Sequence, residues 1–199
     1  MSVDKASTQG HSHGAPLSGR RILHGVCGSI AAYKGAEVCR QLVKAGAEVQ
    51  VVMTRAATRF VAPLTFQALS SHPVLVEMFP DDAGGAALTH ITLARGADLV
   101  VVAPASADLI ARAACGRADD LLACVLLATT APVLLAPAMN PAMWAHPMTR
   151  ENVERLSARA GHRIVGPAEG DTACGEEGPG RMVEPAAVLE RAVALLSGG

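Results

Sequence analysis

Four short apolar runs, each followed by a turn and then by a helical pattern, constrain the fold of this chain more than any other feature. The runs are rich in Val, Ile, Leu and Ala, and they are Arg20–Val26, Ala47–Met53, Asp98–Ala103 and Pro132–Ala136. Short apolar runs bounded by turn residues are typical of buried strands, and their alternation with helices predicts βαβ units. The pattern therefore predicts an α/β fold: a single Rossmann-like, doubly wound domain with a mainly parallel sheet and helices on both faces.

The length and the apolar content fit one folded domain with a tail. The chain has 199 residues, of which 50% are hydrophobic and 18% charged. These values suffice for a full core, and we expect the domain to span residues 20–197. Met1–Gly19 is rich in Ser, Gly and His and has no apolar run, so we expect a disordered N-terminal tail at 1–19 and no signal peptide. His11 and His13 in this tail are expected to be solvated and not to bind a metal.

Charge and cysteine usage exclude several function classes. The net charge of -1 gives no general attraction to nucleic acid or to an acidic membrane. Leu121 to Met148 contains no Asp, Glu, Lys or Arg, but Thr and Pro interrupt it, so we expect a buried helix and strand and no membrane span. The five cysteines are scattered and form no CxxC pair. This favours a reducing, cytoplasmic location, with neither a disulfide framework nor a metal site.

The turn after the first run could bind an anion. Gly28 and Ser29 stand there, ahead of a helical pattern over Ile30–Ala45. Backbone N–H groups and a hydroxyl at the N-terminus of a helix suit a phosphate. The turn lacks the full GxGxxG fingerprint, so a plain turn in which Ser29 caps the helix is an equal alternative. Thr54, at the end of the second run, is a candidate second hydroxyl ligand.

Polar side chains also follow the third and fourth runs. Ser106 is placed to cap a helix, and Asp108 stands in its first turn, where it could simply complement the helix dipole. The stretch Ala136–Trp144 holds Asn140 beside Pro141, and proline favours a rigid, non-helical backbone at the residue before it. Ligands of open α/β sheets bind beyond the carboxyl ends of the strands. Asn140 is therefore a candidate ligand-binding residue, and a proline-rich turn that merely carries an Asn is the alternative.

The remaining candidates are a histidine and two loops. His90 lies in a short apolar segment, where a lone histidine is more often a packed core residue than a catalyst. Pro80–Ala87 is predicted to be a loop that acts as a lid or a subunit contact. The glycine-rich segment Gly166–Val183 is predicted to be a long irregular loop with an accessible Cys174. The other cysteines stand in apolar contexts and are expected to be inert packing residues: Cys27, Cys39, Cys115 and Cys124.

Four ordered motifs make the chain similar to one family over about Arg20–Leu196. The motifs are GSIAAYK (Gly28–Lys34), THITLARGADLVVVAPASADL (Thr89–Leu109), PAMNPAMW (Pro137–Trp144) and ACGEEGPGRM (Ala173–Met182). The chain resembles the homo-oligomeric flavin-containing cysteine decarboxylases, which include phosphopantothenoylcysteine decarboxylases and peptidyl-cysteine decarboxylases. Four motifs at matching spacing are more specific than any one of them alone.

The resemblance implies an FMN cofactor and gives roles to individual residues. The residues implied to contact FMN are Gly28, Ser29, Ile30, Thr54, Ala105, Ser106, Asp108 and Met139. Those implied to be catalytic are His90, Asn140 and Cys174. Those implied to bind the substrate are Asn140, Met143, Ala173, Gly175 and Met182, the last three within a mobile clamp at 166–183. Asp108 stands where many family members carry Asn, so its contact with the flavin is left open.

The implied chemistry accounts for these residue types. Oxidation of a cysteine thiol to a thioaldehyde creates an electron sink beta to the carboxylate, which then leaves as CO2 and gives an aminoenethiol. A neutral imidazole suits the base that assists thiol oxidation, which fits His90. A neutral amide holds the carboxylate without the strong stabilisation by a cation that would resist its loss, which fits Asn140.

The resemblance leaves the substrate open between two subfamilies. The clamp Cys174 favours conversion of 4'-phosphopantothenoylcysteine to 4'-phosphopantetheine in coenzyme A biosynthesis. The first alternative is oxidative decarboxylation of a peptide C-terminal cysteine to an aminoenethiol in modified-peptide biosynthesis. The second is a non-catalytic flavoprotein regulatory subunit, which the presence of both His90 and Asn140 disfavours. The family also implies a homotrimer or a dodecamer of trimers, with FMN at the subunit interface.

Overall fold

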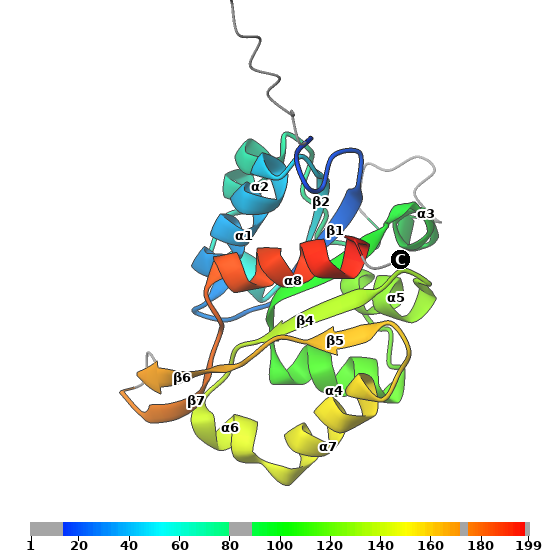
Figure 1. The fold of residues 1–199 in the computed structure, drawn as a ribbon. Helices are drawn as coiled ribbons and strands as arrows, with labels where there is room; N and C mark the ends of the chain where they lie inside the picture. Colours follow the sequence, from blue (N-terminus) through cyan, green and yellow to red (C-terminus); the bar gives the residue numbers. More distant parts are fainter. Residues whose placement is uncertain (1–13, 80–88, 172–174, 198–199) are drawn as a thin grey trace, which may run out of the picture.

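The computed structural model describes residues 14–79, 89–171 and 175–197. Five strands form a parallel sheet in the order β2-β1-β3-β4-β5 (Figure 1). The strands are β1 (Arg21–Val26), β2 (Glu48–Met53), β3 (Leu99–Ala105), β4 (Val133–Pro137) and β5 (His162–Ile164). The strand order reverses between β1 and β3, which is the doubly wound topology.

Helices cover both faces of this sheet (Figure 1). One face carries α1 (Ala32–Lys44), α2 (Pro63–Ser70) and α8 (Pro185–Ser197). The other face carries α3 (Thr89–Gly96), α4 (Ala107–Cys115), α5 (Leu121–Ala128) and α7 (Pro147–Ser157). Two short helices follow strand ends, η1 (Ala57–Arg59) after β2 and α6 (Pro141–Ala145) after β4. The predicted α/β class, with a parallel sheet between two helical layers, is confirmed.

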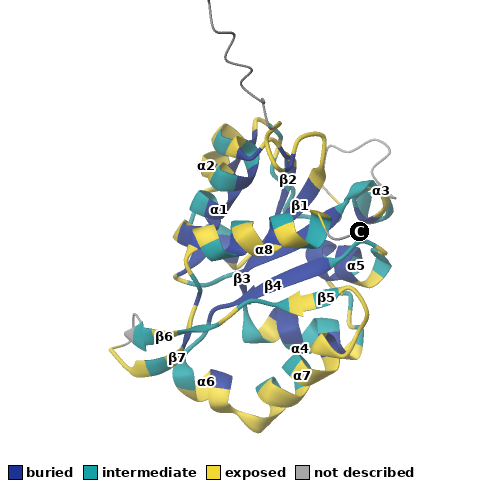
Figure 2. Cartoon of the chain, in the orientation of Figure 1, coloured by how far each residue is buried: buried dark blue, intermediate teal, exposed yellow. Residues whose placement is uncertain are grey.

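Each central strand is buried on both sides, as Figure 2 shows for β3 and β4. In β3, Val101 packs in the core under α1 and α8, whereas Val100 and Val102 pack in the core under α4 and α5. Because successive side chains of a strand point to opposite faces, a sheet covered on both sides requires an unbroken apolar run. This requirement explains why the strands were recognisable in the sequence.

The folded chain begins earlier than predicted. Residues 14–19 include a turn, and the Leu17 side chain is 0% exposed. The Leu17 N–H donates a hydrogen bond to the Ala45 carbonyl at 2.8 Å, which ties the turn to the end of α1. The predicted tail boundary at residue 19 is therefore wrong for this part, because a single apolar residue gives no periodic signal. Residues 1–13 lie outside the described residues.

The prediction of an irregular loop at 166–183 is also wrong in part. This segment contains an antiparallel hairpin of β6 (Ala168–Asp171) and β7 (Glu177–Arg181). Gly170 and Gly178 have φ angles of +136° and +149°, a backbone region that glycine adopts readily. The two strands thus pair through backbone conformations that glycine permits, and they lack the β-branched residues that are enriched in most strands. The predicted loop Pro80–Ala87 lies outside the described residues.

The predicted burial of the cysteines is wrong at Cys115, whereas the charge-free stretch forms the predicted buried helix and strand, α5 and β4. Cys27 and Cys39 are buried, Cys124 is partly exposed, and Cys115 is exposed, so the packing role expected of Cys115 is wrong. Cys115 is the last residue of α4, where the chain leaves the sheet. No described helix is long and apolar enough to cross a membrane, and α5, in the charge-free stretch, has only 8 residues.

Candidate active site

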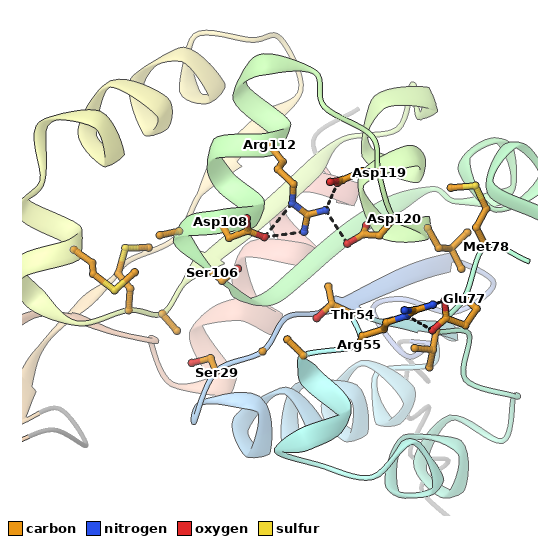
Figure 3. A pocket seen from close by; sticks show the side chains of 18 of the residues that line it. Ser29, Thr54, Arg55, Glu77, Met78, Ser106, Asp108, Arg112, Asp119 and Asp120 are labelled. Atoms are coloured by element: carbon orange, nitrogen blue, oxygen red, sulfur yellow. Dashed lines mark hydrogen bonds and ion pairs between the residues drawn. The ribbon is translucent and has the colours of Figure 1, made fainter.

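A pocket of about 920 Å³ opens at the carboxyl ends of the strands, on both sides of the point where the strand order reverses (Figure 3). Its lining includes a residue after each of the first four strands: Gly28 and Ser29 after β1, Thr54 after β2, Ser106 after β3 and Met139 after β4. Pockets of 300–1,000 Å³ at a topological switch point commonly hold a cofactor or a small molecule. The structure therefore brings these sequence-predicted residues together.

Gly28 is required by the close approach of two loops beneath this pocket. A Cβ atom at Gly28 would lie 2.5 Å from the Cβ of Ala56, which follows β2. Real Cβ atoms do not come this close, so any side chain at position 28 would push the β1 and β2 loops apart. The glycine thus leaves room for close packing of the two loops, a role that the sequence did not indicate.

Three hydroxyl groups on the pocket wall belong to Ser29, Thr54 and Ser106 (Figure 3). Their oxygens accept hydrogen bonds at 3.2, 3.2 and 3.3 Å from the N–H groups of Ala31, Ala57 and Leu109. Each hydroxyl accepts from the backbone; those of Ser29 and Thr54 keep their own O–H for donation to a ligand, whereas that of Ser106 also lies within hydrogen-bond reach of the buried Cys27 side chain. Ser106 is the predicted N-cap of α4, whereas α1 begins only at Ala32 and Ser29 caps the turn before it.

The wall formed by α4 and the start of α5 carries an arginine that holds three carboxylates. The guanidinium of Arg112 lies 2.9 Å from Asp108, 2.8 Å from Asp119 and 2.7 Å from Asp120 (Figure 3). Its side chain is only 12% exposed. Burial acts to lower the pKa of Arg112, but the hydrogen bonds to Asp120 and Asp119 outweigh it and raise that pKa. Arg112 therefore stays charged and fixes Asp108, the position where the family pattern differs.

Asn140 is not itself among the residues that line the pocket, but it directly follows the lining residue Met139 in the chain and precedes the lining residue Met143 by three positions. Its backbone is extended, with φ −61° and ψ 146°, as the flanking proline predicted. Its side-chain oxygen accepts from the Ala142 N–H at 2.7 Å and so caps α6. This cap fixes the amide, because the oxygen faces the helix and the NH2 group must face the other way.

The β6–β7 hairpin packs directly on this stretch. The Met139 N–H donates to the Gly180 carbonyl at 2.9 Å, and a Cβ at Gly178 would lie 3.3 Å from the Pro141 Cβ. The hairpin lies beside α6 in Figure 1. Part of the predicted clamp thus covers the Asn140 segment.

The chain after the hairpin is anchored to α1 by Lys34, whose side chain is 8% exposed. The ammonium of Lys34 donates to Glu184 at 2.8 Å and to the Met182 carbonyl at 3.2 Å. The hydrogen bond from Lys34 and the charge of its ammonium hold the pKa of Glu184 below its usual value. Met182, expected to contact substrate, has a 1% exposed side chain in the core under α1 and α8, and the pocket lining does not include it.

Other predicted site residues lie elsewhere. His90 lies on α3, outside the pocket lining, and its buried Nδ1 has no hydrogen-bond partner among the described residues. Ala105 is buried in β3, and Ile30 is 61% exposed and does not line the pocket. Gly175 lies in an exposed bend of the clamp, and Ala173 and Cys174 lie outside the described residues. The described residues contain no group of His, Cys, Asp or Glu that could hold a metal.

Sequence reasoning missed the residues that order the pocket walls. Asp108 and Arg112 are four apart on a helix, a spacing that predicts an ion pair, and Asp120 precedes an apolar run as an N-cap does. These two local patterns predict the Asp108–Arg112 ion pair and the cap at Asp120. Arg55 pairs with Glu77 at 2.6 Å and Lys34 with Glu184 at 2.8 Å. Neither pair has a local signal, because its members are far apart in the chain.

A model of the flavoprotein family matches residues 11–197. The chain belongs to the flavoprotein family. It is 54% identical over 169 residues to the coenzyme A biosynthesis bifunctional protein CoaBC of Vibrio cholerae, covering 85% of this chain and 42% of that protein. It is 49% identical over 181 residues to CoaBC of Escherichia coli K12, covering 91% of this chain and 44% of that protein. The chain thus spans less than half the length of these curated relatives.

Solved structures of the family share the fold over nearly their whole length. A PPC decarboxylase mutant complexed with pantothenoylaminoethenethiol is 32% identical, with a TM-score of 0.77 over 90% of this chain and 99% of that one. The FMN-dependent cysteine decarboxylase SpaF is 35% identical, with a TM-score of 0.72 over 88% of this chain and 99% of that one. The predicted family resemblance is confirmed.

Proposed function

We propose that the chain is an FMN-dependent decarboxylase that converts 4'-phosphopantothenoylcysteine to 4'-phosphopantetheine and CO2 in coenzyme A biosynthesis. The observation that carries this proposal is the amide of Asn140, which its cap fixes next in the chain to Met139, a lining residue of a cofactor-sized pocket. The similarity to CoaBC proteins and to a PPC decarboxylase supports the choice of substrate. We place the reaction in the cytoplasm, where the thiols of Cys27 and Cys39 stay reduced.

The residues around the pocket fit FMN. Three hydroxyl groups and the N-terminal end of α4 suit the phosphate and the carbonyl oxygens of the flavin. Met139 and Met143 offer polarizable apolar surface to a flat aromatic ring. When bound, FMN supplies the two-electron acceptor for oxidation of the substrate thiol, on which loss of CO2 depends.

Replacing Gly28 with Ala is expected to weaken FMN binding by about tenfold, since overpacking typically costs 1–3 kcal/mol and here would displace the pocket floor. Fluorescence titration of the apoprotein with FMN measures the affinity. Gly96→Ala is the matched control, because the nearest atom to a Cβ there is 3.8 Å away. Unchanged FMN affinity in Gly28→Ala would contradict the proposed position of the cofactor.

Asn140 acts in this proposal by holding the substrate carboxylate through its NH2 group. The cap bond to the Ala142 N–H keeps the amide oxygen of Asn140 away from the substrate carboxylate, because the two negatively polarised oxygens would repel each other. A neutral donor positions the carboxylate and leaves it free to lose its charge as CO2. Met143, three residues after Asn140, is 49% exposed and offers an apolar contact to the cysteine part of the substrate.

His90 is the proposed base, and its position supports an oligomeric active site. It lies on α3, outside the pocket of its own subunit. We propose a homotrimer, or a dodecamer of trimers, in which FMN lies between subunits and His90 serves the flavin of a neighbour. Large apolar side chains at the starts of α1 and α2 and at η1 are exposed and suit subunit contacts: Ile30, Tyr33, Phe60 and Leu64.

Light scattering at micromolar concentration is expected to give about three or twelve times the chain mass of 20.4 kDa, because the proposed site is complete only between subunits. A monomer that still decarboxylates its substrate would contradict the shared site. A monomer without activity would contradict the proposed assembly alone.

Mass spectrometry of products tests the substrate. The FMN-loaded protein is incubated separately with phosphopantothenoylcysteine and with a peptide that ends in cysteine. Loss of CO2 alone from the first is the expected result. Loss of CO2 and two hydrogens from the peptide would favour the modified-peptide alternative, to which the 35% identity with SpaF points. Turnover of neither would favour a non-catalytic flavoprotein.

A further inference from the structure

The amide that we assign to the substrate carboxylate already binds a carboxylate within the chain. The Nδ2 of Asn140 donates a hydrogen bond to Oε2 of Glu176 at 2.9 Å. Glu176 stands in the clamp, directly before β7. Its side chain ends in the same chemical group as the proposed substrate, and it uses the same NH2 group of Asn140.

Two features of the fold direct this contact. The Ala142 N–H holds the amide oxygen, so the NH2 group is the part of Asn140 that faces a ligand. The bond from the Met139 N–H to the Gly180 carbonyl fixes β7 on the same stretch and brings Glu176 to the amide. The contact thus follows from how the hairpin docks on the Asn140 segment.

We propose that Glu176 is an internal competitor for the carboxylate site, an inference that rests on the proposed function. Glu176 occupies the NH2 group of Asn140 in the substrate-free enzyme. The substrate carboxylate displaces it, because two carboxylates beside one amide nitrogen repel each other.

This exchange affects only ligands that carry a carboxylate. A ligand without a carboxylate cannot replace the charged hydrogen bond that it would remove, so it does not displace Glu176. Once CO2 has left, the product lacks the displacing group, and Glu176 returns to Asn140. Glu176 therefore lowers the affinity for the substrate, leaves the affinity for the product unchanged, and keeps the NH2 group of Asn140 hydrogen-bonded when no substrate carboxylate is present.

Binding of two unreactive ligands to the FMN-loaded protein tests the proposal. S-methyl phosphopantothenoylcysteine keeps the carboxylate but has no free thiol, and S-methyl phosphopantetheine lacks the carboxylate. Calorimetry with the first ligand is expected to give an affinity about threefold to tenfold higher for Glu176→Ala than for the wild type, the size of one partly exposed charged contact. The second ligand is expected to bind both proteins equally.

Two further variants keep the test independent of folding defects. Glu176→Gln removes the charge and keeps the shape, and we expect an affinity for the first ligand between those of the wild type and Glu176→Ala. Glu177→Ala removes the neighbouring exposed acid of β7 and should match the wild type. Equal or weaker binding of the first ligand by both Glu176 variants would overturn the inference alone. Binding by no protein, the wild type included, would overturn the proposed function and this inference with it.

Discussion

Asn140→Asp is expected to lower kcat/KM for phosphopantothenoylcysteine by at least about 100-fold, with a loss of stability of no more than about 1 kcal/mol from the exposed contact with Glu176. Asp keeps the oxygen that accepts from the Ala142 N–H, and it is as good an N-cap as Asn, so α6 should remain capped. It loses the NH2 donor and gains a negative charge beside the substrate carboxylate. A hydrogen bond to a charged group contributes about 1.5–3 kcal/mol, and repulsion adds to that loss.

Product formation by mass spectrometry and thermal unfolding of the FMN-loaded protein measure the two effects separately. Asn140→Ser is the matched control, because Ser is also a good N-cap but brings no charge, so its loss of activity should be smaller. Asn140→Ala should lose both activity and about 1 kcal/mol of stability. An Asp variant with near wild-type kcat/KM would exclude Asn140 as the carboxylate donor.

The free energy of unfolding is expected to fall by about 3 kcal/mol as the pH decreases from 6.5 to 4, because of His24. This side chain is 0% exposed in β1, and burial lowers its pKa from 6.5 to about 4. Its Nε2 lies 3.0 Å from the Ala103 carbonyl and donates to it, and its ring meets Phe66 edge to face. The folded protein therefore keeps the imidazole of His24 neutral above about pH 4.

The sign follows from proton binding. Between pH 4 and 6.5 the unfolded chain protonates His24 and the folded chain does not, so acid favours unfolding. The contribution is complete above pH 6.5 and is lost as the pH falls towards 4. Urea unfolding at several pH values measures it, and His24→Leu should flatten the slope in this range. Some slope should persist, because burial also lowers the pKa of His162.

His146→Asn is the control for this prediction. His146 is exposed and caps α7 through its ring nitrogen, and Asn is also a good cap, so the variant should keep the wild-type slope. An unchanged slope in His24→Leu would mean that His24 is protonated in the folded protein.

The strands were predictable because their burial on both faces demands unbroken apolar runs. Ser106 and Asn140 were predictable for a related reason: a cap and a proline act on the backbone within a few residues, so local sequence is sufficient. The hairpin at 168–181 was not, since its glycines permit strand pairing without a strand-like composition.

The sequence by itself determined the fold class, the edge of the sheet at which the pocket lies and the family. Each of these depends on periodicity or on motifs that are contiguous in the chain. Only the tertiary structure decided that Arg112 also reaches Asp119 and Asp120, that Lys34 anchors the chain at Glu184 and that Glu176 meets Asn140. Such contacts join residues that folding brings together, and their strength depends on burial and distance, which no local pattern encodes.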